Sequence, residues 1–167
     1  LLMTLTMFQF LYVATTTVQA VYEELENQNA NIENTNVSFN VSYEDGTHSK
    51  QLKTTEEGVI VCSIKIEKSG VLNDGKIHIE NPNFEIDVDK LDKTYVKGVE
   101  GNDIMLNQMV TGEKNINIPV KFVKKEAISS DYFDKQNTFT FTAKYKSENR
   151  TEKEIQKNIT VDTQWSN

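Results

Sequence analysis

From Val37 onward, the apolar residues of this 167-residue chain recur at every second position. Successive side chains of an extended strand point to opposite faces, so this period gathers apolar side chains on one face and polar side chains on the other. The segments Val37 to Tyr43 and Phe139 to Tyr145 both follow the pattern. It predicts strands with one buried face and one face in water.

The stretch GVIVCSIKIE, residues 58–67, differs because apolar side chains occupy both of its faces over the first half. A strand covered on both sides is predicted to be central in its sheet. The other alternating runs are Ile77 to Ile79, Phe84 to Val88, Ile116 to Phe122 and Ile155 to Val161, with weaker strands expected around Tyr95 to Val99 and Ile104 to Met109.

Turn-forming residues separate these runs. Asp45-Gly46, Asn73-Asp74-Gly75, Asn81-Pro82-Asn83 and Gly101-Asn102 each supply a residue that tolerates positive φ, or a proline that fixes it. Short alternating strands with a turn about every ten residues are typical of sandwiches. We therefore predict an all-β fold, an antiparallel two-sheet β-sandwich of the immunoglobulin-like or jelly-roll-like kind, over residues 36–167.

Two segments of different character precede the predicted sandwich. Residues 1–20 carry no charge and end in a Thr-rich stretch with Val18 and Ala20 at the positions expected before a cleavage site. They are predicted to be a signal peptide whose positively charged n-region is truncated, with a membrane anchor as the alternative. Residues 21–35 are rich in Asn and Glu and are expected to be a polar linker. The protein is accordingly expected to be exported, to the extracellular space or the cell surface.

The formal net charge is −7, and the lysines are scattered among acidic residues instead of forming a basic stripe. Phosphate backbones and anionic lipid surfaces attract proteins with clustered positive charge. We therefore expect no nucleic-acid partner, and no membrane contact apart from the export segment.

The residues that carry most enzyme and metal chemistry are few. Cys62 is the only cysteine and lies in the apolar phase of the predicted central strand, where a thiol acts as a small buried hydrophobe. His48 and His78 have no nucleophile or ligand close to them in sequence. We predict no enzyme activity, no cofactor and no metal site, although the acidic run Asp87, Asp89 and Asp92 leaves bound calcium open as an alternative.

Aromatic residues outside the alternating pattern are the remaining binding candidates. A flat ring can stack on a sugar or pack against a protein ligand. The residues named as ligand-contact candidates on this basis are Tyr95, Tyr132, Phe133 and Trp165. The segments Asp45 to Thr55 and Lys125 to Asn137 are expected to be exposed loops that would border such a surface.

The chain resembles the N-terminal β-sandwich region of large surface proteins of low-GC Gram-positive bacteria. The similarity rests on the order of an export-like segment, the start EELENQN, and the strand-like stretches GVIVCSIKIEKSGVLNDGKIHIENPNFEI and NINIPVKF. It implies an adhesin-like protein, wall-anchored or membrane-anchored and built from tandem sandwiches. The chain departs from this pattern because it shows no wall-sorting motif and no second repeat.

Two functions follow from these observations as hypotheses. The first is a non-enzymatic extracellular structural or adhesive β-sandwich module of a bacterial surface protein, whose partners would be a host or cell-wall glycan, a protein ligand, or neighbouring repeat domains of the same chain. The alternative is a carbohydrate-binding accessory module of a secreted glycoside hydrolase. Sandwiches host many unrelated functions, so the fold alone does not choose between them.

Overall fold

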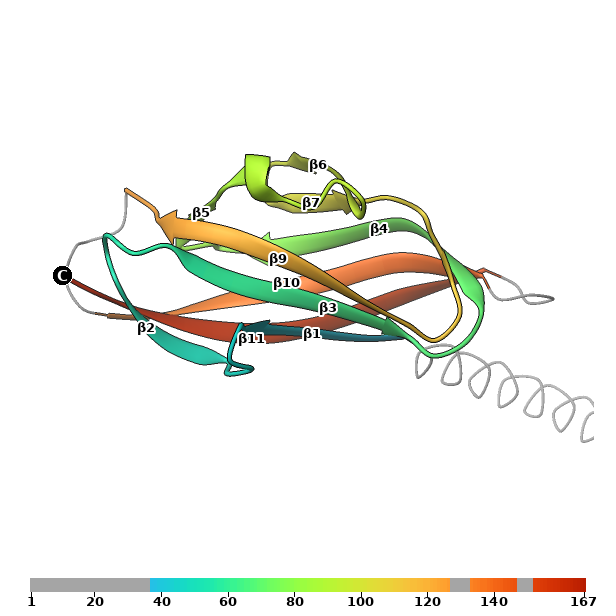
Figure 1. The fold of residues 1–167 in the computed structure, drawn as a ribbon, viewed down its shortest axis with the longest axis horizontal. Coiled ribbons are helices and arrows are strands. Elements are labelled where there is room, and N and C mark those ends of the chain that lie inside the picture. The colour runs from blue at the N-terminus through green and yellow to red at the C-terminus, as the bar shows by residue number, and fades with distance from the viewer. Residues whose placement is uncertain (1–36, 127–132, 147–151) are drawn as a thin grey trace, which may run out of the picture. The chain divides into compact units, whose positions relative to one another are not determined.

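The computed structural model describes residues 37–126, 133–146 and 152–167. These belong to one compact unit, Asn36–Asn167, built almost wholly of strands in two packed sheets (Figure 1). The predicted all-β, two-sheet sandwich is therefore confirmed. The predicted signal peptide and linker, residues 1–20 and 21–35, lie outside the described residues.

The smaller sheet has four strands in the order β1-β3-β9-β5. Its strands are β1 (Val37–Tyr43), β3 (Gly58–Ile66), β9 (Lys114–Lys124) and β5 (Phe84–Ile86), all paired antiparallel. β3 pairs with β1 on one side and with β9 on the other, so the prediction that GVIVCSIKIE forms a central strand is confirmed.

The larger sheet has seven strands, in the order β2-β11-β10-β4-β7-β6 with β8 paired to β4. Its strands are β2 (Ser49–Lys53), β11 (Lys153–Ser166), β10 (Phe133–Lys146), β4 (Gly70–Glu80), β7 (Asp103–Leu106), β6 (Val96–Glu100) and β8 (Met109–Thr111). A single-turn 3₁₀ helix, η1 (Val88–Lys90), lies between β5 and β6.

One pairing departs from the predicted antiparallel arrangement: β2 runs parallel to β11. After β1, a tight turn forms in which the amide of Gly46, at φ 84°, donates to the carbonyl of Tyr43. The chain then crosses from the smaller sheet to the larger one, where β2 adds to the edge of β11. The segment Asp45 to Thr55 is thus not only an exposed loop, because its middle is the strand β2.

The core lies between the two sheets and is formed by the side chains that the alternation places inward. Val41, Cys62, Ile118 and Phe141 are all fully buried, and each alternates along its strand with side chains on the other face that are less buried. The largest fully buried side chains are Trp165, Tyr43, Tyr145, Phe84, Phe122, Phe139 and Phe141. Asn137 is also fully buried, so the end of the predicted loop Lys125 to Asn137 belongs to β10 and the core.

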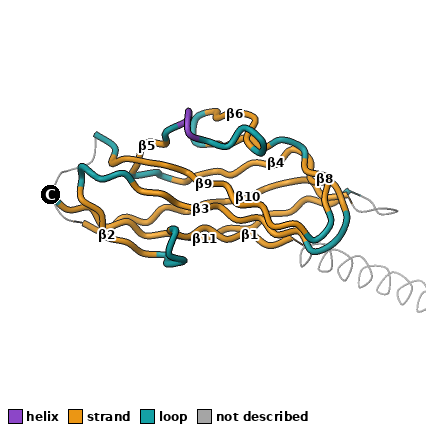
Figure 2. Tube along the Cα trace, viewed as in Figure 1, coloured by secondary structure: helices purple, strands orange, loops and turns teal. Residues whose placement is uncertain are grey.

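The strands run along the length of the sandwich, and the described chain begins and ends at different ends of it. β1 starts toward the end opposite the one where β11 finishes (Figures 1 and 2). Tyr43, at the end of β1, contacts Thr163 and Asp162 near the end of β11. The two strands therefore run in the same direction in opposite sheets.

Candidate binding face

The outer face of the seven-stranded sheet carries neutral polar side chains in register. Thr140 and Thr142 of β10 alternate with the buried Phe139 and Phe141, so their side chains lie on the face away from the core. The ladder pairs Thr142 with Lys76 and Gln156, and Thr140 with His78 and Asn158. On this face, polar groups from several strands are held side by side.

A groove with a volume of about 670 Å³ opens on this sheet. It lies where the pairing of β10 with β4 shifts between Thr142 and Lys144, because an irregularity there bends the strand. Asp74 and Lys144, which both line the groove, form an ion pair at 3.5 Å. The residues that line the groove are Asp74, Lys76, Met105, Thr142, Ala143, Lys144, Glu154, Ile155 and Gln156.

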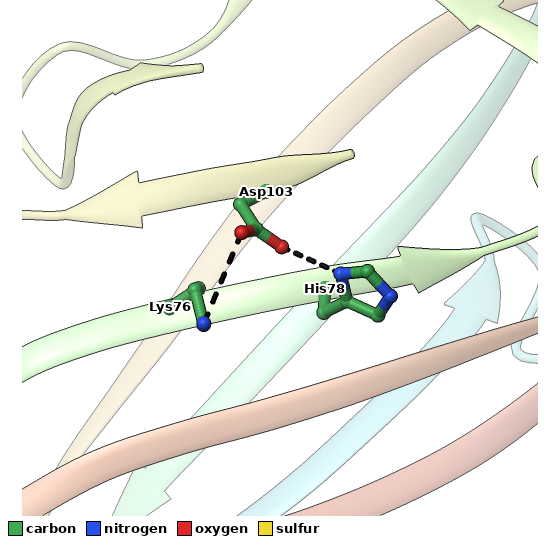
Figure 3. Close-up of polar contacts among 3 residues, drawn as sticks. All are labelled: Lys76, His78 and Asp103. Carbon is green, nitrogen blue, oxygen red and sulfur yellow. Dashed lines mark hydrogen bonds and ion pairs between the residues drawn. The ribbon is translucent and has the colours of Figure 1, made fainter. Parts of the chain in front are cut away.

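Beside the groove, Asp103 of β7 contacts two residues of β4 (Figure 3). Its Oδ1 lies 2.6 Å from Nδ1 of His78, and its Oδ2 lies 3.8 Å from Nζ of Lys76. All three side chains remain partly exposed. A carboxylate between two basic groups can orient an imidazole, but no described nucleophile touches His78, so the cluster can bind polar groups and lacks the parts of a catalytic triad.

Sequence reasoning missed this cluster. It treated His78 as a lone surface histidine because Asp103 is 25 residues away along the chain. The signal that could have found it is the pairing of two strands, because β4 and β7 place His78 directly opposite Asp103. That pairing becomes visible only when the order of the strands in the sheet is known.

The structure describes the side chains of two of the four aromatic candidates, Trp165 and Tyr95, and these two do not form an exposed platform. Trp165 is 0% exposed and packs edge-on against Phe122, with ring centroids 6.1 Å apart. Its ring therefore belongs to the core and offers no face to a ligand. Tyr95 is half-buried against the core, with Nζ of Lys114 5.8 Å from its ring centroid.

The structure describes less of the other two aromatic candidates. The backbone of Phe133 opens β10 and pairs in register with Trp165. Tyr132 lies outside the described residues. Ligand contact by Tyr95, Tyr132 and Phe133 stays a prediction.

Cys62 lies between Val41 of β1 and Ile118 of β9 and is completely buried. Burial without a charged partner disfavours the thiolate and raises the pKa of Cys62 to about 12. A thiol with that pKa is protonated at neutral pH, so it acts as core packing and not as a nucleophile.

The acidic residues that were considered as calcium ligands, Asp87, Asp89 and Asp92, do not form a cluster that could hold a metal ion. Asp87 and Asp92 flank η1 on its two sides, and Asp89 is exposed within it. Among the residues that the structure describes, no group of three or more His, Cys, Asp or Glu side chains is placed to hold a metal ion.

Comparison with known proteins gives a structural match without a sequence match. No protein-family model matches the chain, and the search of curated proteins found no match. A variant of BcpA, the major pilin subunit of Bacillus cereus, superimposes with a TM-score of 0.52 at 14% identity over 77% of this chain. The chain spans only 40% of that pilin subunit. At this identity the match shows a shared β-sandwich fold.

Two further structures resemble the chain more weakly. Another structure of the Bacillus cereus pilin gives a TM-score of 0.46 at 16% identity, again over 77% of this chain and 40% of the pilin. The collagen-binding subdomain of the Enterococcus faecalis surface protein ACE gives 0.31 at 12% identity, over 77% of this chain and 96% of the subdomain. In the ranges that the structure describes, no helix has the length and apolar character of a membrane span.

Proposed function

We propose that this sandwich is a non-enzymatic, extracellular structural or adhesive module of a bacterial surface protein. The fold is shared with a pilin subunit, which supports a structural role without establishing it. The chain's own geometry supports the same role. Its partners would then be neighbouring domains of the same protein, and a protein or glycan ligand of the cell wall or a host.

The observation that carries the proposal is the placement of β1 and β11. β1 starts toward one end of the sandwich and β11 finishes at the other (Figure 1). A pull between these two points acts along both strands. β1 would then have to slide along β3, and β11 along β10 and β2, so that many backbone hydrogen bonds are loaded together. This geometry suits a domain that carries tension between its neighbours.

The adhesive side of the proposal rests on the outer face of the seven-stranded sheet. Its groove near Thr142 and Gln156 presents hydroxyl and amide groups, which can bond polar ligands without a large desolvation cost. The carbohydrate-module alternative needs an exposed aromatic platform. In the described ranges, the exposed large apolar side chains are Val88, Val110 and Val123, so no observation there favours that alternative.

Single-molecule force spectroscopy tests the structural role. One variant carries Ser38→Cys and Asn167→Cys as attachment points and loads β1 and β11 along their axes. The control carries Ser38→Cys and Lys68→Cys, which lie at the same end of the β1–β3 pair, because Val37 is opposite Ile66. Pulling there opens the ladder one pair at a time. The buried Cys62 does not compete for attachment in the folded protein.

We expect the end-to-end geometry to resist severalfold higher force than the control geometry. Equal, low unfolding forces in the two geometries would show that the fold is not arranged to carry tension, and the structural proposal would be wrong.

A further inference from the structure

A second, smaller groove runs along the last strand of the seven-stranded sheet. It has a volume of about 290 Å³ and lies between η1 and β6. Four consecutive residues of β6, from Val96 to Val99, line it. Because successive side chains of a strand point to opposite faces, a groove that touches four in a row follows the strand's free edge. Among the strands that the structure describes, β6 pairs with β7 alone, and no strand adjoins its other edge.

Four of the residues that line this groove are apolar: Val88, Leu91, Val96 and Val99. Leu91 is buried, while Val99 is partly buried and packs against the core. Val88 of η1 is 49% exposed at the rim, which makes it one of the few large apolar side chains in the described ranges that face water. An exposed valine beside a buried leucine is a surface that a ligand's aliphatic side chain could cover.

The charged residues that line the groove are both lysines, Lys93 and Lys97. In two other grooves of the described part of the sandwich, each lysine has an acidic partner: Lys144 pairs with Asp74, Lys76 with Asp103, and Lys121 with Glu57. Neither Lys93 nor Lys97 forms an ion pair with any residue that the structure describes. In a chain of net charge −7, this groove is therefore lined by two positive charges that have no ion-pair partner among the described residues.

The groove is held in shape by hydrogen bonds from Asn107. Its backbone amide donates to the carbonyl of Tyr95 at 2.8 Å, and its side-chain amide donates to the carbonyls of Lys93 and Thr94. These bonds fix the turn that leads into β6. A groove fixed before binding loses less conformational entropy when it is filled.

β6 itself is irregular where the lysine lies. Val96 pairs with Leu106 and Gly98 with Met105, so Lys97 is the extra residue of a bulge. A bulge and a lysine on an edge strand prevent indiscriminate pairing with other strands, including those of a second copy. Recognition here must therefore come from side chains that match an apolar wall and two positive charges.

We propose that this groove is a docking site for an acidic, aliphatic segment of a partner protein, in which carboxylates meet Lys93 and Lys97 and an aliphatic side chain covers Val88. This inference goes beyond the structural role proposed above and does not depend on it. Charge-assisted bonds to carboxylates are stronger than neutral ones, and the apolar wall adds burial that a purely ionic patch lacks.

The probe is a fluorescein-labelled eight-residue peptide of alternating valine and glutamate, titrated into the whole chain and followed by anisotropy. The matched peptide replaces every glutamate with lysine. We expect the acidic peptide to bind and the basic peptide not to bind.

Lys93→Glu with Lys97→Glu should weaken binding of the acidic peptide by roughly tenfold or more. The control pair, Lys53→Glu with Lys68→Glu, changes the net charge equally at exposed sites outside the groove and should change affinity less than about twofold.

Gly98→Phe tests the groove independently of charge. Gly98 lines the groove, and a Cβ added there meets no atom within 4 Å, so a large side chain can be accommodated beside the groove without overlapping the core. We expect the variant to keep its thermal unfolding midpoint and to lose peptide binding. The proposal is overturned if the acidic peptide does not bind, if both peptides bind equally, if the control lysine pair weakens binding as much, or if folded Gly98→Phe binds normally.

Discussion

The hydroxyl of Tyr43, at the end of β1, lies 2.5 Å from Oγ1 of Thr163 in β11. It also donates to the carbonyl of Asp162 at 3.1 Å. Tyr43 belongs to the four-stranded sheet and Thr163 to the seven-stranded sheet, and both are buried. A polar contact therefore joins the first and last strands of the sandwich across its apolar core, and its position specifies how the two sheets are aligned.

Removing that hydroxyl should destabilise the protein. In Tyr43→Phe the ring still fills its place, but Oγ1 of Thr163 is left buried without this partner. We expect the free energy of unfolding to fall by about 1–3 kcal/mol in guanidinium denaturation. Tyr95→Phe is the matched control, because the ring of Tyr95 is partly exposed, and it should change stability by less than about 0.5 kcal/mol. Equal effects of the two substitutions would contradict the assigned role of Tyr43.

The same residue predicts a dependence on alkaline pH. Burial, partly opposed by the bond to Thr163, raises the pKa of Tyr43 above its ordinary value of 10.0. Its contribution to stability is complete below pH 10 and is lost as the pH rises from there through the folded-state pKa, because the unfolded chain releases its proton first. The stability difference between the wild type and Tyr43→Phe should therefore narrow as the pH rises from about 10 to about 11 in denaturation curves. A constant difference over that range would show that the pKa is not raised.

The contacts of Asp103 with His78 and Lys76 should contribute little to stability. All three side chains are partly exposed, and exposed ion pairs are screened by water and salt. We expect Asp103→Ala to lower the free energy of unfolding by less than about 1 kcal/mol, with a smaller loss in 1 M salt. Asp89→Ala removes an exposed carboxylate without a described partner and serves as the control. A large, salt-independent loss in Asp103→Ala alone would indicate a structural role that the geometry does not support.

Alternation along the chain was sufficient to predict the class of fold and most of the core. Val41, Ile64, Ile118 and Phe141 are buried as their period-two positions require, because a sandwich needs only that each strand carry one apolar face. The parallel pairing of β2 with β11 could not be predicted in this way. It depends on which sheet the chain enters after the turn at Gly46, and SKQLK carries no strong alternation.

The binding surfaces were harder to predict because they depend on the order of the strands. The groove beside Lys76 is formed by strands that are distant in sequence, whereas the groove beside Lys97 is formed by the local segment from η1 to β7; both lie where the strand register shifts. Aromatic character was a misleading signal for Trp165, since a large ring near the end of a chain is as useful in a core as on a surface. Whether Trp165 lies in the core or on the surface can be decided only from the strand register, which places it beside Leu52.

Cys62 should resist thiol reagents in the folded protein. Its thiol is buried between neighbouring strands and protonated at neutral pH, so both access and thiolate are missing. We expect no reaction with Ellman's reagent in native buffer at pH 8 and a stoichiometric reaction of one thiol in 6 M guanidinium. Rapid native labelling would show that the central strand β3 opens without global unfolding.

Gly58, the first residue of β3, should be intolerant of any side chain. It lies opposite Phe122 in the ladder, and an added Cβ would overlap the Phe122 ring. That ring cannot move freely, because its centroid lies 4.4 Å from that of Phe84 and 6.1 Å from that of Trp165. We expect Gly58→Ala to lower the free energy of unfolding by about 1–3 kcal/mol, as overpacked cores do.

Gly98→Ala is the control: its Cβ enters open space, so stability should stay constant or rise slightly in the same denaturation experiment. If Gly58→Ala were as stable as Gly98→Ala, the aromatic cluster around Phe122 would have to be looser than its contacts imply.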